Sequence, residues 1–323
     1  MTTLDNSNDS SPLSLPQDQE MGEMYDDITP KTVEIPEELR YKSKAERIMA
    51  VQTERVVLYP RLGEAVNRVL WMIKQKPRSR APGLIVTGPT NSGKTTLGNW
   101  ILNAYSQLSP SSFIDSVRPC AVMIELSGLT TQRGVYGRIL EQIHAPVDSH
   151  ARLADRELVV TMTLRNINCR LLILDEAQDV LKTSERDQQR VLDALKYLMN
   201  SLKLPVLALG VEQAGKAFDS DQHLRARFSE IKLPSWKDDD DLIDLLASLE
   251  PNLLLQRSVN LRTREMVKKL LELSEGRLGY IVDILRNAAI EGISSGMETI
   301  TPEMLRRPWD VPSHEILDCP TLH

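Results

Sequence analysis

One stretch, from Leu84 to Leu97, restricts the possible folds of this chain more than any other part of the sequence. Its apolar beginning, Leu84-Ile85-Val86, predicts a buried strand. Residues 88–95 then match the G-x-x-x-x-G-K-[ST] spacing of a phosphate-binding loop without a mismatch, and a helical pattern follows. Because strand, glycine turn and helix stand in this order, we interpret the stretch as a nucleoside triphosphate site.

Each residue type in this loop suits a bound phosphate. Gly88 and Gly93 allow the backbone to form a nest whose N–H groups point at phosphate oxygens. We expect Lys94 to place its cation against the β and γ phosphates as a catalytic group, and Thr95 to hold Mg²⁺. The helix that begins near Lys94 directs its positive end at the same anion. The predicted cofactors are ATP and Mg²⁺, and the predicted ATP-site residues are Gly88, Pro89, Thr90, Asn91, Ser92, Gly93, Lys94, Thr95 and Thr96.

A second stretch places two acids after an apolar run. Residues 171–174, Leu-Leu-Ile-Leu, predict a buried parallel strand that ends in Asp175 and Glu176. Ligands in open α/β sheets sit at this end of the strands. Asp175 suits a metal-binding role, and Glu176 suits the polarisation of an attacking water as a general base. An acidic surface loop is the alternative, but the upstream phosphate loop favours the functional interpretation, and Glu176 then predicts hydrolysis as well as binding.

Charge is distributed unevenly along the chain. Residues 1–40 carry ten acids and two basic residues, a charge of −8, which leaves +2 of the total of −6 for the remainder. The near-neutral remainder argues neither for nor against a nucleic-acid partner. We expect residues 1–40 to be a disordered tail, more simply a solubilising leader than a docking segment for a partner.

Three cysteines, Cys120, Cys169 and Cys319, lie far apart in the sequence with no paired spacing. This spacing predicts no zinc site and no disulfide framework, so a reducing cytoplasm is the expected location, with Cys120 and Cys169 as buried packing residues. No apolar stretch approaches the length of a membrane span, and the first residues are unlike a signal peptide. We therefore expect no membrane association.

The remaining periodicity completes an α/β core and a helical end. Apolar runs predict further strands over 121–126 and 205–210, and helical spacing predicts helices over 43–50, 61–75, 134–144, 151–166 and 186–202. After Trp236, segments 242–249, 263–273, 278–293 and 302–306 predict an all-helical lid. The expected domains are an acidic tail over 1–40, a nucleotide-binding core over 41–236, the lid over 237–310 and an irregular tail over 311–323.

Several stretches carry a family resemblance. They are residues 55–61 ahead of a helix, 88–96, Leu-Asp-Glu-Ala-Gln at 174–178, and Leu-Arg-Ala-Arg-Phe at 224–228 followed by Leu-Pro-Ser-Trp at 233–236. With the order of strands and the lid, these stretches resemble AAA+ P-loop NTPases, and more narrowly the TniB/TnsC class of transposition ATPases, over about residues 45–310. The resemblance implies a parallel sheet flanked by helices and a small all-helical C-terminal lid.

The resemblance also implies function and partners. Such a protein assembles with ATP as a homo-oligomeric ring or filament on the backbone of double-stranded DNA, recruits a DDE transposase and contacts a TniQ-like targeting protein, and hydrolysis drives its disassembly. Two alternatives stay open: a replication initiator or helicase loader, and a non-hydrolysing nucleotide-gated scaffold that signals through its acidic tail. The sequence shows neither a dedicated DNA-reading domain nor a zinc-binding leader, as many initiators and loaders carry, nor an effector domain for a scaffold.

Less specific candidates complete the predicted site, and each has a plainer explanation. Arg227 is the preferred arginine finger toward a neighbouring subunit, although arginines here can be surface charges. Tyr59, with Pro60, is a candidate for the base pocket, although packing explains both equally well. Because Gly210 and Val211 stand where a polar sensor is usual, the sensor candidates are Glu212, Gln213 and, in the lid, Arg277, beside a glycine where many lids place an arginine. The DNA-binding candidates are Thr131, Arg133 and Lys182, which solvated loops explain equally well.

Overall fold

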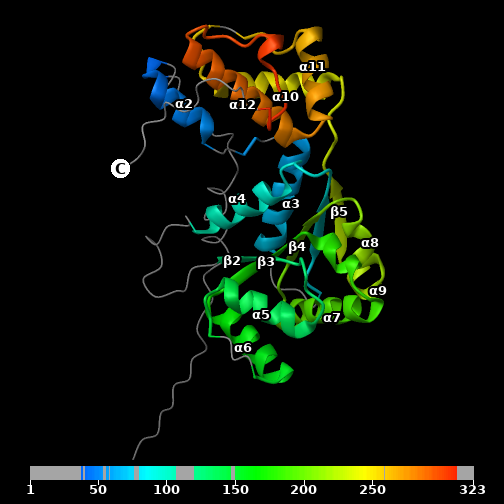
Figure 1. The fold of residues 1–323 in the computed structure, drawn as a ribbon. Coiled ribbons are helices and arrows are strands. Elements are labelled where there is room, and N and C mark those ends of the chain that lie inside the picture. The colour runs from blue at the N-terminus through cyan, green and yellow to red at the C-terminus, as the bar shows by residue number, and fades with distance from the viewer. Residues whose placement is uncertain are drawn as a thin grey trace, which may run out of the picture.

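The computed structural model describes residues 38, 41–53, 56–57, 59–75, 80–106, 120–146, 150–257 and 259–310. Within these residues, parallel strands form one sheet in the order β2-β3-β4-β1-β5. Figure 1 shows this sheet among helices, with a separate helical layer at one end. The strands are β1 (Gly83–Thr87), β2 (Cys120–Glu125), β3 (Cys169–Asp175), β4 (Val206–Gly210) and β5 (Phe228–Lys232). The predicted parallel α/β sheet with a helical C-terminal region is confirmed.

The two faces of the sheet belong to two different cores. Along β1, Leu84 and Val86 pack in one core, whereas Ile85 packs in the other. Successive side chains of a strand point to opposite faces, so both faces of the central strands must be covered. All residues of β1 and β4 are buried, which is why these strands are visible as apolar runs in the sequence.

Strand β5 was missed by the sequence analysis, which treated residues 224–228 only as an arginine box. It pairs with β1 alone and forms an edge of the sheet. Its sequence, Phe-Ser-Glu-Ile-Lys, alternates because Glu230 and Lys232 are exposed while Ile231 is buried. An edge strand with one wet face lacks the continuous apolar run that marks the inner strands.

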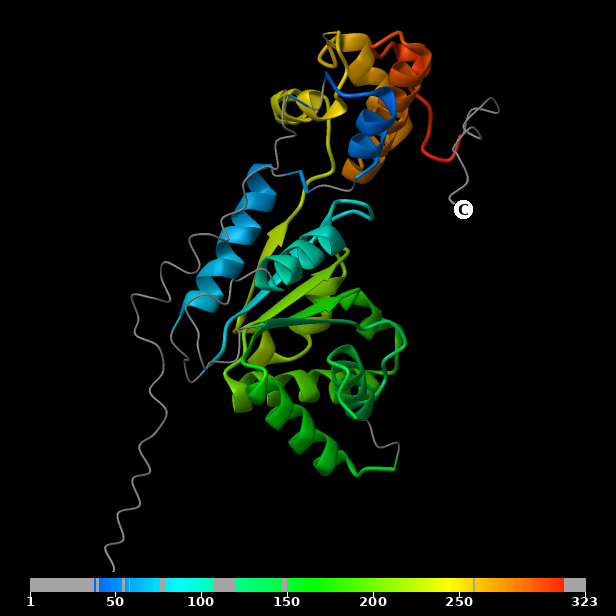
Figure 2. The same cartoon turned by 90° about the vertical axis from the view of Figure 1, so that its left-hand side faces the viewer.

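Helices cover both faces of this sheet. Helix α3 contacts β1 and β5, helix α4 packs on β2, β3 and β4, and helix α5 packs between β2, α6 and α7. Figure 2 shows α3 running along one side of the sheet, with the helical layer at the far end. The bounds are α3 (Pro60–Lys74), α4 (Lys94–Ser106), α5 (Gln132–Gln142), α6 (Leu153–Asn166), η3 (Ala177–Lys182), α7 (Glu185–Leu202), α8 (Ala214–Asp219) and α9 (Gln222–Arg225).

The helical layer is built from the C-terminal segments. Two of its helices begin at side-chain caps: Asp239 accepts from Leu242 N–H ahead of α10, and Thr263 accepts from Met266 N–H ahead of α11. The predicted helix over 302–306 is instead a short 3₁₀ turn. The bounds are α10 (Asp240–Leu249), η4 (Glu250–Leu253), α11 (Arg264–Ser274), α12 (Leu278–Ser295) and η5 (Pro302–Met304).

An N-terminal helix, α2 (Lys44–Gln52), packs against this layer and not against the sheet. Figure 1 shows it beside α12. Arg47 donates to both carboxylate oxygens of Glu298 at 2.7 Å and to the Leu254 carbonyl at 3.0 Å. Lys44 Nζ donates to the Ser294 carbonyl at 3.1 Å. The predicted domain boundary between residues 236 and 237 stays a prediction. Helix α2 was included in the predicted core, but its hydrogen-bond partners lie in the helical layer, more than 200 residues away in the sequence.

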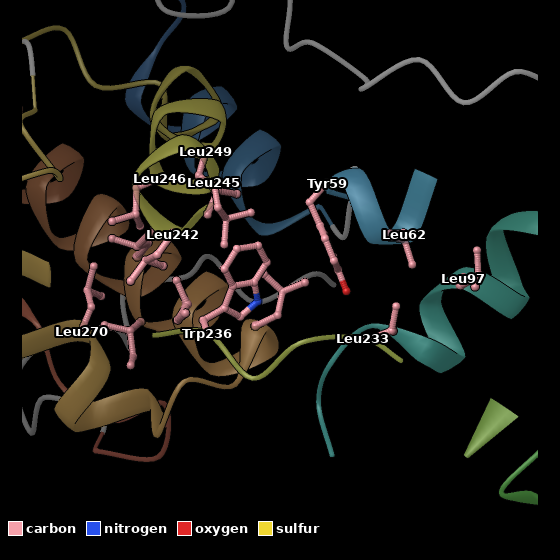
Figure 3. Close-up of a cluster of buried hydrophobic side chains, with 14 of the residues drawn as sticks. Tyr59, Leu62, Leu97, Leu233, Trp236, Leu242, Leu245, Leu246, Leu249 and Leu270 are labelled. Carbon is pink, nitrogen blue, oxygen red and sulfur yellow. The ribbon is translucent and has the colours of Figure 1, made fainter. Parts of the chain in front are cut away.

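The chain passes between core and lid twice, once ahead of Tyr59 and once after Leu233. The Tyr59 and Trp236 rings, one from each passage, meet edge to face with centroids 5.1 Å apart. Figure 3 shows this pair between the lid leucines and Leu62 and Leu97 of the core. Both rings are buried, so the two passages are held together by aromatic packing.

Cys120 and Cys169 are register partners on β2 and β3, and both are free thiols. They were expected to be buried, whereas the structure leaves both half-buried. A hydrogen bond with Cys120, together with burial, raises the pKa of the Cys169 thiol. Cys319 and the predicted tail over 311–323 lie outside the described residues, as does almost all of the predicted acidic tail over 1–40. In the described part of the chain, no helix has the length and apolar character needed to cross a bilayer.

Candidate active site

The glycine loop joins β1 to α4 at the carboxyl end of the central strands. Gly88 N–H donates to the Gly210 carbonyl at 3.2 Å, which ties the loop to the end of β4. A side chain at Gly88 would collide with Ser92 Oγ at 2.8 Å and Leu233 Cβ at 2.9 Å. Gly93 has φ of 90°, a conformation that other residues rarely adopt. Both predicted glycines are therefore required by the fold of the loop.

Lys94, the first residue of α4, folds its side chain into this loop. Its ammonium donates to the Pro89 carbonyl at 2.6 Å, the Gly88 carbonyl at 3.1 Å and Ser92 Oγ at 3.2 Å. Burial lowers the pKa of Lys94, and the nearby charges of Glu176 and Asp175 oppose this shift. The loop thus holds a buried cation. When a phosphate binds, its oxygens can replace the loop oxygens as hydrogen-bond acceptors for the Lys94 ammonium.

Thr95 and Asp175 meet, as the sequence analysis expected of two ligands of one metal. Thr95 Oγ1 donates to Asp175 Oδ2 at 2.8 Å, and Asp175 Oδ1 accepts from Glu176 N–H at 2.9 Å. Asp175 is buried at the carboxyl end of β3. A hydroxyl and a carboxylate with few other protein ligands suit Mg²⁺, which keeps waters and takes phosphate oxygens for its remaining positions. The residues present therefore fit this metal.

Glu176 is held in an unusual backbone conformation next to this pair. Its φ of 52° is left-handed, where a non-glycine residue stores about 1–3 kcal/mol of strain. Gln178 Nε2 donates to its carboxylate, and Gln178 Oε1 accepts from Val211 N–H at 3.0 Å. The sequence analysis missed Gln178. Two features of the sequence together could have indicated it. One is an amide side chain three residues after Asp175, and the other is a glycine, Gly210, at the end of the neighbouring strand.

The lid contacts the loop directly. Gly279, in the first turn of α12, donates its N–H to the Asn91 carbonyl at 2.7 Å. A side chain at Gly279 would lie 3.0 Å from Asn91 Cβ and 3.1 Å from the Asn91 oxygen. The neighbouring Arg277 points elsewhere: it pairs with Glu275 at 2.8 Å and covers the Tyr280 ring at 5.4 Å. The lid thus contacts the loop through a backbone hydrogen bond. The sensor role of Arg277 stays a prediction.

The other two sensor candidates lie at the surface. Glu212 is exposed and pairs with Lys232 at 3.4 Å, beyond the carboxyl end of β5. Gln213 is exposed and precedes α8. The sensor role of Glu212 and Gln213 stays a prediction.

Arg227 lies far from its own glycine loop. It immediately precedes β5, and its carbonyl accepts from Gly83 N–H at 2.9 Å, at the amino end of β1. The glycine loop follows the opposite, carboxyl end of β1. The Arg227 guanidinium donates to Asn200 Oδ1 at 2.8 Å. Arg227 therefore cannot complete the pocket of its own chain, and a finger role requires a second copy.

The DNA-binding candidates lie on one side of β2 and β3. Thr131 caps α5, accepting from Gly134 N–H at 3.0 Å, and Arg133 is exposed in the first turn of that helix. Lys182 is exposed but pairs with Asp179 at 2.6 Å, and Asp179 also accepts from Ser127 Oγ at 2.9 Å. Their DNA contact stays a prediction.

Tyr59 packs as a core residue. Its side chain is buried against Trp236, and its hydroxyl lies 3.5 Å from the Ser92 carbonyl. Burial raises the pKa of this phenol. Tyr59 therefore touches the glycine loop from the passage between core and lid, and its contact with a nucleotide base stays a prediction.

The family model for the bacterial TniB protein matches residues 47–238. The chain belongs to the TniB family. The match spans the glycine loop, both acids after β3 and the arginine before β5, so every predicted catalytic residue of this TniB-family chain lies inside it. No curated protein sequence matches the chain.

Solved structures show that this TniB-family chain has an AAA+ P-loop ATPase fold. The Aeropyrum pernix ORC2 protein is 15% identical, with a TM-score of 0.56 over 80% of this chain and 70% of that one. The Aeropyrum pernix ORC1 protein in complex with DNA is 14% identical, with a TM-score of 0.57 over 80% and 67%. Drosophila ORC bound to DNA is 16% identical, with a TM-score of 0.53 over 89% and 71%. The expected AAA+ fold is thereby confirmed.

Proposed function

We propose that this protein is an ATPase that assembles on double-stranded DNA and regulates transposition, with hydrolysis driving its disassembly. The observation that supports this most is the meeting of Thr95 and Asp175, 2.8 Å apart, beside Lys94 and Glu176 at one edge of the sheet. The residues proposed as metal ligands, phosphate cation and general base come from the start of α4, the end of β3 and the position directly after β3.

In this mechanism Lys94 leaves the loop carbonyls and binds the β and γ phosphates, while the loop N–H groups hold their oxygens. Mg²⁺ held by Thr95 and Asp175 would neutralise charge that develops between those phosphates. Glu176 accepts a hydrogen bond from the attacking water and takes its proton. Arg227 of an adjacent copy completes the pocket, which makes turnover depend on assembly.

Membership of the TniB family supports the biological assignment. The proposed partners are a DDE transposase, which the assembly recruits to target DNA, and a TniQ-like targeting protein. The proposed DNA contacts, through Thr131, Arg133 and Lys182, go to phosphates, so binding should be insensitive to sequence and should weaken steeply with salt. Electron microscopy with duplex DNA and a slowly hydrolysed ATP analogue would report oligomer form and nucleotide dependence together.

The decisive experiment is the variant Glu176→Gln. It keeps the shape of the side chain but removes the base, which contributes roughly 10²–10⁴-fold to the rate of such reactions. We expect phosphate release to fall at least about 100-fold while binding of a fluorescent ATP analogue and assembly on DNA are retained. Glu185→Gln, an exposed glutamate in the first turn of α7, is the matched control and should keep wild-type turnover. Wild-type phosphate release from Glu176→Gln would refute the assignment of the base.

A further inference from the structure

Glu176 is connected to the end of β4 by a single side chain, that of Gln178. The amide nitrogen of Gln178 donates to the Glu176 carboxylate, and the amide oxygen accepts from Val211 N–H. An amide carries its donor and its acceptor on two separate atoms, so it can donate to a carboxylate and accept from a backbone N–H at the same time. The geometry therefore makes a bridge between the proposed base and the strand that lies between β3 and β1.

The structure reserves space for this bridge. A side chain at Gly210, the last residue of β4, would lie 2.5 Å from Gln178 Oε1 and 2.7 Å from Ala214 Cβ. A Cβ atom does not approach another heavy atom so closely, so any other residue at position 210 would displace the amide. The Gln178 amide can therefore occupy this place only because Gly210 has no side chain.

We infer that Gln178 is the positioning residue for Glu176, and that it occupies the place that a polar side chain at the end of β4 would otherwise take. This inference rests on the proposed ATPase function of the same site. Gln178 fixes one carboxylate oxygen and thereby leaves the other directed at the attacking water. The oxygen of Gln178 accepts from Val211 N–H, directly after β4. The orientation of Glu176 is therefore fixed by a contact with the end of the sheet, and not only by the segment that carries Glu176.

The bridge continues to the other side of the site. Gln178 Nε2 lies 3.4 Å from Asp179 Oδ1, and Asp179 accepts from Ser127 Oγ and Lys182 Nζ. Ser127 opens the segment after β2 that carries two of the DNA-binding candidates. The proposed base therefore shares a continuous set of polar contacts with that segment, through Gln178.

The test separates hydrogen bonding from packing with two substitutions. Gln178→Met keeps the length of the side chain but removes both hydrogen bonds, and Gln178→Glu keeps an acceptor for Val211 N–H but removes the donor to Glu176. For both we expect kcat to fall about tenfold or more, as part of the contribution of a positioned base, with the KM for ATP and the melting temperature changed little. Gln188→Ala is the control, because that amide donates to the carbonyls of Leu181 and Thr183 and not to Glu176. It should keep wild-type kcat.

The outcomes are distinguishable from failure of the proposed function. If Glu176→Gln is inactive and Gln178→Met keeps wild-type kcat, the role of Gln178 is refuted while the base assignment stands. If Gln178→Met fails to fold, Gln178→Glu decides alone: an unchanged kcat refutes the inference, and a lower kcat with unchanged binding of the ATP analogue supports it. If both variants lose binding and turnover in equal measure, Gln178 is only structural and the inference is refuted.

Discussion

The buried ion pair that attaches α2 to the lid gives the sharpest stability prediction. Arg47 and Glu298 expose only 3% and 11% of their side chains, and two donations of 2.7 Å join them. In Arg47→Met, Glu298 would keep the weaker donation from Gln256 N–H at 3.3 Å. Removing one partner of such a pair leaves an uncompensated buried charge and costs about 3–5 kcal/mol. We expect Arg47→Met to lose roughly that much free energy of unfolding for the lid and α2 together.

Urea unfolding, followed with amide hydrogen exchange in α2, measures this loss. Arg61→Met is the matched control, because Arg61 and Glu64 form an exposed pair whose side chains are 62% and 53% accessible. Exposed pairs contribute about 0–1 kcal/mol. The double variant Arg47→Met/Glu298→Leu should recover most of the loss, since no buried charge is left. If Arg47→Met costs no more than Arg61→Met, the pair does not attach α2 as argued.

The same pair gives the stability of the lid a pH dependence. The hydrogen bond from Arg47 is the main cause that lowers the pKa of Glu298 in the folded chain. Its contribution is therefore complete above the usual glutamate pKa of about 4.3 and is lost as the pH falls through the lower folded value. Wild-type protein should lose stability in this acid range more steeply than Glu298→Gln, and parallel curves for the two proteins would contradict the linkage.

Two further substitutions test the proposed contact of Arg227 with a second copy and the contact of the lid with the glycine loop. Arg227→Ala should abolish ATP-dependent assembly on DNA while the affinity of isolated chains for nucleotide is retained, with Arg225→Ala, a residue paired to Asp219 at 3.6 Å, as the control; a loss of nucleotide affinity in isolated Arg227→Ala chains would show a structural role. Gly279→Ala should push α12 away from Asn91 and cost about 1–3 kcal/mol in lid docking, seen as faster hydrogen exchange at the start of α12. Unchanged exchange there would contradict the contact.

The sequence predicted the centre of the site better than its surroundings. Lys94, Thr95, Asp175 and Glu176 lie in or directly after buried strands and a fixed loop, and local patterns determine such positions. Gln178 escaped prediction because its second partner, Val211, is 33 residues further along, directly after another strand. Such a contact depends on strand order, which no local pattern contains.

The same reasoning explains the differences in the fold. Helix α2 was assigned to the core because it is a neighbour of α3 in the sequence, whereas Arg47 and Glu298 are 251 residues apart. Strand β5 was missed because only Phe228 and Ile231 face other apolar groups, and Glu230 and Lys232 interrupt the run. Long-range pairing and edge exposure, more than propensity, account for these differences.

The double passage between core and lid has a mechanical consequence. A lid on one connection can swivel in any direction, but a lid on two connections can turn only about the line that joins them. Tyr59 and Trp236 mark the two connections, and the hydrogen bond from Gly279 to Asn91 joins the lid to the glycine loop as well. We therefore expect a shift of the loop at Asn91 to be passed to α12 through this hydrogen bond, and to α2 through the Arg47–Glu298 pair.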